Sequence, residues 1–161
     1  MSENFDEFAR RREGTRRDNE QLRRKAKPEW ERLKGLLSAL ASDGKGIDGH
    51  RFEWTTDLTG NPLLVLNNVS ATISLGPEQD GIHHGKVRFT RRPAGVGKAF
   101  PDKSPVPDKT WSLEPMVENG EFLWFVFERA WKISSAELKE EIAKELARHH
   151  IEYQKAYGLA S

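Results

Sequence analysis

The chain has 161 residues, a net charge of +1 at pH 7 and no cysteine, which excludes disulfides, thiolate zinc sites and cysteine nucleophiles. Its apolar residues, 36% of the chain, include 5 Trp and 8 Phe, enough for one packed domain and against global disorder. No apolar run is long enough to cross a membrane and the N-terminus lacks a secretory pattern, so we expect a soluble, cytoplasmic protein with no membrane partner.

The first segment, residues 1–27, is highly charged and poor in β-branched residues, which is typical of a solvated helix or a loose arm. Arg10 to Lys27 carries nine basic residues against three acidic ones. The remaining residues, 28–161, are predicted to form a single α+β domain. This domain opens with an amphipathic helix from Pro28 to Ser42, because proline suits the first helical position and the leucines that follow share one arc. Leu22 and Ala26 are in phase with that arc, so the helix can extend back through Pro28 with a kink.

The middle of the chain predicts five or six antiparallel strands, because apolar and polar residues alternate there between turn signals. The clearest turn is Asn119-Gly120, whose residues tolerate the positive φ angles of a two-residue type I′ hairpin. A second turn is expected at Asn67-Asn68. The strands are expected at His50–Asp57, Pro62–Leu66, Val69–Leu75, Ile82–Arg91, Lys109–Glu118 and Glu121–Glu128.

The C-terminal segment predicts a second helix, from Ser134 to Tyr157. Ser134 is expected to cap its N-terminus and Glu137 to complete a capping box. One stripe along this helix contains Leu138, Ile142, Leu146, His149, Tyr153 and Tyr157. The sequence therefore predicts an α+β fold in which an N-terminal and a C-terminal helix pack on one face of an antiparallel sheet.

The strand Glu121–Phe127 is apolar on both faces, unlike its neighbours. Two explanations remain open. Either the long loop Arg92–Asp108 or the N-terminal arm covers the second face, or that face is a homodimer interface, a surface for another protein, or an apolar ligand groove. The first functional hypothesis is therefore a non-enzymatic binding or interaction module that uses this strand and the loop. Its expected binding residues are Phe122, Trp124, Phe125 and Phe127.

Basic residues suggest an alternative function. Alternate residues of one strand form a row spaced close to nucleic-acid phosphates, and the row extends into the long loop. With the arginine-rich arm and stacking on the aromatic strand, this row favours a nucleic-acid-binding protein as the alternative hypothesis. The expected polyanion-binding residues are His84, Lys86, Arg88, Arg91, Arg92 and Lys98.

Motifs for catalysis do not pass a spacing test. Gly95 to Ala99 resembles part of a phosphate-binding loop but lacks its first glycine and its Ser/Thr. Both adjacent histidine pairs have the wrong spacing for one metal ion. Glu128 is a candidate general base, although a salt bridge to Arg129, Lys132 or a distant arginine is the favoured interpretation, and His83 and His84 are the other weak catalytic candidates. We therefore expect no catalytic residue, metal or cofactor, and we lean away from an enzyme.

Overall fold

The computed structural model describes residues 2–43, 51–79, 82–92 and 106–156, with side-chain environments described from residue 20 onward except at residues 77–79. In chain order, one helix comes before the strands and a second helix comes after them. The elements are α1 (Ser2–Ser42), β1 (Glu53–Thr56), β2 (Pro62–Leu66), β3 (Val69–Gln79), β4 (Ile82–Arg91), β5 (Lys109–Glu118), β6 (Glu121–Val126), the short 3₁₀ helix η1 (Phe127–Arg129), β7 (Trp131–Ile133) and α2 (Ser135–Ala156).

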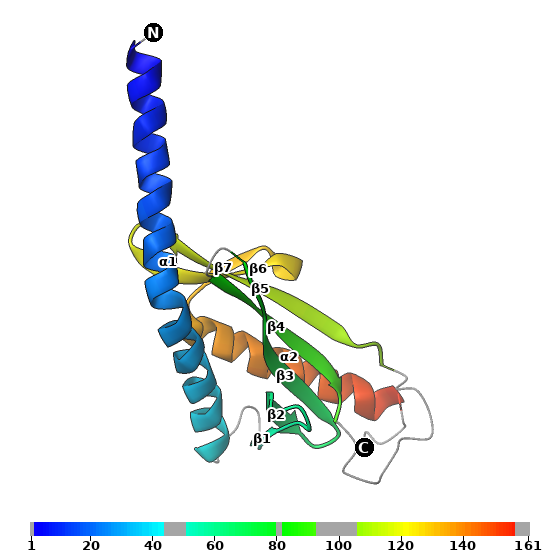
Figure 1. The fold of residues 1–161 in the computed structure, drawn as a ribbon. Helices are drawn as coiled ribbons and strands as arrows, with labels where there is room; N and C mark the ends of the chain where they lie inside the picture. The colour runs from blue at the N-terminus through cyan, green and yellow to red at the C-terminus, as the bar shows by residue number, and fades with distance from the viewer. Residues whose placement is uncertain (1, 44–50, 80–81, 93–105, 157–161) are drawn as a thin grey trace.

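The strands form a seven-stranded antiparallel meander in which each strand pairs with the next one along the chain (Figure 1). The predicted α+β class is confirmed, with one strand more than the six ranges expected. The additional strand is β7, which pairs Trp131 with Val126 and Ile133 with Trp124. η1 lies between β6 and β7 and reverses the direction of the chain, and Ala130 adopts a left-handed φ of 53° at this reversal.

Two predicted turns are confirmed by their backbone angles. Asn119 and Gly120 have φ values of 52° and 78° between β5 and β6, as a type I′ hairpin requires. Asn67 has a φ of 53° between β2 and β3. Asn and Gly accept the left-handed region at low cost, so these turns fix the register of both hairpins.

One face of the sheet, here called the inner face, forms the core with both helices. Alternate residues of β3 to β6 point to it and join a single apolar cluster with the stripes of α1 and α2. The residues between them point to the opposite, outer face. The inner-face members are Val69, Ala71, Ile73, Val87, Phe89, Trp111, Leu113, Trp124 and Val126, and the principal helix members are Trp30, Leu33, Leu37, Leu138, Ile142 and Leu146.

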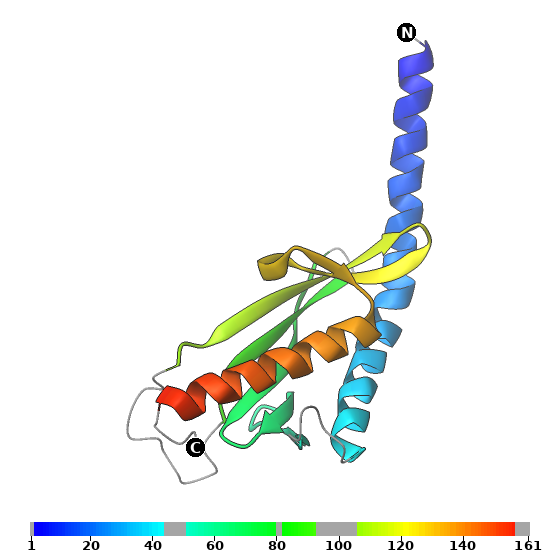
Figure 2. The same cartoon turned by 180° about the vertical axis from the view of Figure 1, so that it is seen from behind.

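α1 is one helix of 41 residues that runs through Pro28, so the predicted helix Pro28–Ser42 is its C-terminal part. At 1.5 Å per residue it is about 60 Å long. Figures 1 and 2 show its N-terminal half extending away from the sheet, beyond the β5–β6 hairpin. Lys25 marks the point of contact, where its Nζ donates to the carbonyl oxygen of Gly120 at 3.0 Å. The division into an arm of residues 1–27 and a domain of residues 28–161 stays a prediction.

α2 begins with the predicted capping box. The Glu137 N–H donates to Ser134 Oγ at 3.2 Å, and the Ser134 N–H donates to Glu137 Oε1 at 3.3 Å. The predicted stripe is buried from Leu138 to Tyr153. Neither helix, over the residues described, combines the length and apolar character that a membrane span requires.

Candidate binding site

The two-sided strand β6 divides the four predicted binding residues between both faces of the sheet. Trp124 is 1% exposed on the inner face, and the half-buried Phe122 packs beside it against the core. Phe125 lies on the outer face, half-buried, and Phe127 of η1 contacts its ring while remaining 55% exposed. A cover from residues 93–105 of the predicted loop falls outside the described residues, so the explanation of the outer face stays open.

Trp124 is fixed by contacts to both helices. Its indole N–H donates to Ser135 Oγ at 2.9 Å, and that hydroxyl donates to Glu29 Oε2 at 2.7 Å. Its ring meets Trp30 edge to face, with centroids 5.9 Å apart and planes at 68°. Because the chain of hydrogen bonds joins β6, α2 and α1, the orientation of Trp124 depends on all three elements.

Gly85 of β4 allows α1 to lie against the sheet at this point. A Cβ atom at Gly85 would lie 2.7 Å from Cζ3 of Trp30, closer than side chains tolerate. The absence of a side chain therefore makes room for the Trp30 ring. This close approach positions α1 across β4 and sets the depth of the space beside it.

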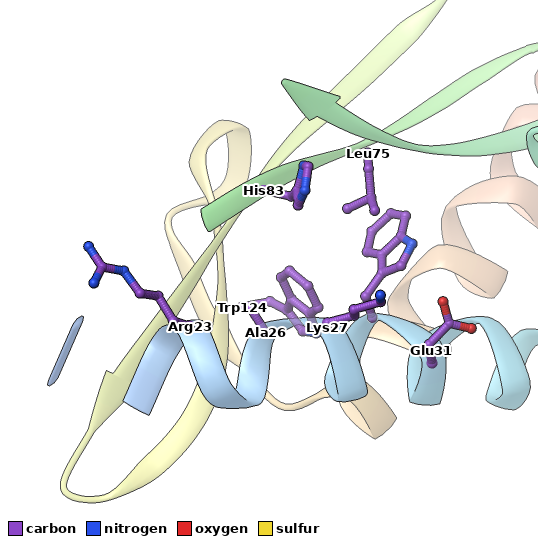
Figure 3. Close-up of a pocket in the computed structure, with 8 residues that line it drawn as sticks. Arg23, Ala26, Lys27, Glu31, Leu75, His83 and Trp124 are labelled. Carbon is purple, nitrogen blue, oxygen red and sulfur yellow. The ribbon is translucent and has the colours of Figure 1, made fainter. Parts of the chain in front are cut away.

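A hollow of about 420 Å³ lies where α1 passes the β3–β4 hairpin and Trp124. Figure 3 shows Leu75 and His83 reaching toward it from the sheet and Ala26 and Lys27 from α1. Leu75 is 43% exposed here, although it follows the inward alternation of β3, because it lies at the rim of the hollow and next to a register shift in the β3–β4 ladder. We call this space the tryptophan pocket; its lining residues are Arg23, Ala26, Lys27, Trp30, Glu31, Leu75, His83 and Trp124.

The charges around the tryptophan pocket are unequal. Lys27 is exposed and makes no ion pair with the described residues, whereas the Glu31 carboxylate already binds Lys34 at 2.8 Å. Arg23 stands at the outer end of the pocket, and Figure 3 shows its guanidinium directed away from His83 and Leu75. The Lys27 ammonium is therefore the lining charge that is available to pair with a ligand.

A second hollow of about 470 Å³ lies on the other flank of α1, beside Phe122 and Leu123. Six of its nine lining residues are charged or polar, and Lys25 among them is already bonded to Gly120. Its lining contains no tryptophan, unlike that of the tryptophan pocket. Its lining residues are Arg24, Lys25, Pro28, Glu29, Glu121, Phe122, Leu123, Ser134 and Glu137.

The predicted basic row is brought together only in part. His84, Lys86 and Arg88 do share the outer face of β4, but His84 lies 3.7 Å from Glu114 and Arg88 pairs with Asp108 at 2.8 Å. Arg92, beyond the end of the strand, lies 3.7 Å from Glu53. These partners neutralise much of the charge that a phosphate backbone would need.

The other members of the row lie elsewhere. Arg91 follows the inward alternation of β4 and is half-buried, and Lys98 falls outside the described residues. Among the three row members on the outer face of β4, Lys86 makes no ion pair with the described residues.

Two buried histidines on α2 were not predicted as a site. His149 has no exposed surface, and neither ring nitrogen has a hydrogen-bond partner among the described residues. Burial lowers the pKa of His149 below its ordinary 6.5, and nearby Glu152 opposes that shift. His150 lies beside it, with Nε2 3.3 Å from Nδ2 of Asn67. Over the described residues, no cluster of three or more His, Asp or Glu side chains is suited to a metal ion.

Glu128 has a structural role that differs from both sequence interpretations. Its carboxylate accepts hydrogen bonds from the Ser112 N–H and, at 3.0 Å, from Ser112 Oγ. The favoured salt bridge to Arg129 or Lys132 is wrong for Lys132, which pairs with Glu118 at 3.5 Å instead. Glu128 therefore fastens η1 to β5, because a carboxylate one strand away can reach the backbone N–H of Ser112.

Comparison with family models, curated proteins and solved structures gives no match for this chain. The sequence pointed to Trp124 but not to Trp30, Lys27 or Leu75 as its neighbours. Gly85, a glycine inside an alternating strand, was the one signal of a close approach.

Proposed function

We propose that this protein is a non-enzymatic binding module whose ligand site is the tryptophan pocket. The observation that carries the proposal is a hollow of about 420 Å³ walled by two tryptophans that belong to the folding core. Small-molecule sites occupy about 300–1,000 Å³ and are mostly apolar, with a few polar groups for orientation. The tryptophan pocket has this size and this composition.

Preorganisation supports binding at this place. Trp124 is held by its bond to Ser135 and by the edge-to-face contact with Trp30. A ligand ring would meet a wall that is already rigid, so little conformational entropy is lost on binding. Leu75, which is 43% exposed, is the apolar group whose contact with water such a ligand would remove.

The chemistry of the lining favours binding over catalysis. Glu31 is the carboxylate of the described lining, and it is held by Lys34. His83 lies with Nδ1 3.2 Å from the carbonyl oxygen of Gly76, so its ring is engaged with the β3 backbone. These contacts support a role of both groups in shaping the rim, which is the arrangement of a receptor for a small molecule.

The proposal is tested by titrating the neutral aromatic probe 3-methylindole into ¹⁵N-labelled protein and following the five tryptophan indole N–H signals. We expect the signals of Trp30 and Trp124 to move with one saturating curve. Those of Trp54, Trp111 and Trp131, which do not line the tryptophan pocket, should stay within error. Equal movement of all five signals, or none at millimolar probe, would contradict the proposal.

Binding through the outer face remains a prediction for a second copy, another protein or a nucleic acid. Phe125→Glu changes that face and leaves the tryptophan pocket intact. Lys86→Glu with Arg88→Glu reverses its charge. Sedimentation of the first variant and oligonucleotide anisotropy at two salt concentrations with the second would show whether this face has a partner.

A further inference from the structure

We infer that the ligand of the tryptophan pocket is a small aromatic carboxylate, an anion with one flat apolar body. This inference rests on the proposed function, because it specifies the ligand class of the same site. The apolar part of the lining favours a ligand with an aromatic ring. The charge distribution at the rim favours a ligand that carries a negative charge.

Lys27 supplies the charge preference. Lys27 lines the tryptophan pocket from the same α1 wall as Ala26, and it has no ion-pair partner among the described residues. Glu31, one turn further along α1, would attract a cation if it were free, but Lys34 holds its carboxylate at 2.8 Å. The unsatisfied capacity at the rim is therefore positive.

A cationic ligand is the main competitor, because tryptophan faces attract ammonium groups. Here a bound cation would approach the Lys27 ammonium. Like charges brought close together are unfavourable, and the cost rises where water is excluded. Lys27 favours an anion instead, so its positive charge decides between the two ligand classes.

The pose follows from these positions. The ring of the ligand would lie against Leu75 and Ala26 and touch only the edges of Trp30 and Trp124, which are 3% and 1% exposed, with its carboxylate turned outward to Lys27 Nζ. A charge-assisted hydrogen bond of this kind is stronger than a neutral one. Salt would weaken it, because Lys27 is exposed to solvent.

The experiment compares three probes that share the indole ring: indole-3-acetate, 3-methylindole and tryptamine, which are an anion, a neutral molecule and a cation at pH 7. We expect indole-3-acetate to bind about tenfold more tightly than 3-methylindole, and tryptamine to bind more weakly than both. The readout is the dissociation constant from the Trp30 and Trp124 indole signals.

Lys27→Gln should remove the preference for the anion, so that indole-3-acetate and 3-methylindole bind with equal dissociation constants. The matched control is Lys144→Gln on α2, which makes the same charge change at an exposed residue outside the tryptophan pocket. The preference should persist in that variant.

Equal binding of indole-3-acetate and 3-methylindole, or a preference that survives Lys27→Gln, would overturn this inference and leave the binding module standing. Tighter binding of tryptamine would assign the site to a cation and also overturn it. No binding by any of the three probes would overturn the inference and the proposed function together.

Discussion

The two faces of the sheet are built from the same alternating strands but differ in what they contact. On the inner face, Trp124 and its neighbours pack against both helices and exclude water. On the outer face, Phe125 contacts Phe127, and ion pairs link β4 to β5 and to Asp108 just before it. Adjacent residues of one strand, equally aromatic, therefore have different roles. Composition alone does not distinguish them; the position of α1 does.

The largest effect is the expected difference in the free energy of unfolding between two single variants, Trp124→Ala and Phe125→Ala. Trp124 is 1% exposed and its loss leaves a cavity among Trp30, Phe122 and Ser135, which costs about 3–5 kcal/mol of the free energy of unfolding. The half-buried Phe125 should cost about 1 kcal/mol. Urea unfolding of both variants measures the difference, and equal losses would show that the two faces are packed alike.

The next effect concerns the approach of α1 to β4. Gly85→Ala places a Cβ atom 2.7 Å from Trp30 and should destabilise the fold by about 1–3 kcal/mol. Gly35→Ala on α1 is the matched control, because its Cβ would meet nothing within 4 Å and alanine favours the helix by about 1 kcal/mol. The two thermal shifts should have opposite signs. A stabilising Gly85→Ala would rule out the close packing of Trp30 on β4.

An effect of similar size is expected from the hydrogen bonds that hold Trp124. Ser135→Ala leaves the indole N–H and the Glu29 carboxylate without their shared partner, at a cost of about 1–3 kcal/mol. In a double-mutant cycle with Trp124→Phe, the two losses should be less than additive, because both changes remove the same bond. Additive losses would mean that the bond does not form in solution.

The smallest effect is a pH dependence from His149. Its lowered pKa means that the unfolded chain binds protons more readily, so this contribution to stability is complete above about pH 6.5 and is lost as pH falls below it. The charged groups near it are Glu152, Lys109, Asp108 and Glu145. His149→Phe should reduce the slope of the free energy of unfolding against pH by at most about 1.4 kcal/mol per pH unit. His84 is partly exposed, and His84→Gln should leave this slope unchanged. An unchanged slope in His149→Phe would contradict the buried neutral ring.

Local signals in the sequence predicted most of the elements. The Asn119-Gly120 hairpin and the Ser134–Glu137 capping box depend on neighbouring residues, and both are confirmed. β7 was missed because three residues after a 3₁₀ turn leave no alternating pattern to read. A strand of that length is recognised only by its pairing with β6.

The candidate site was less predictable, since it depends on contacts between distant segments. Trp30 meets Trp124 across the fold, and only the single glycine at position 85 hinted at the approach. The basic row was read as free charge because its partner Asp108 lies 20 residues from Arg88. Alternation places a side chain on a face but does not say which charge it will meet there.

The most direct test of the account is the titration of 3-methylindole into the wild-type protein and into Ala26→Phe, a variant that places a ring in the tryptophan pocket from the α1 side. We expect the Trp30 and Trp124 indole signals to shift in the wild type, and we expect Ala26→Phe to keep its thermal stability but to respond no longer. Identical binding by the two proteins would contradict the account, because the probe would then occupy some other part of the molecule.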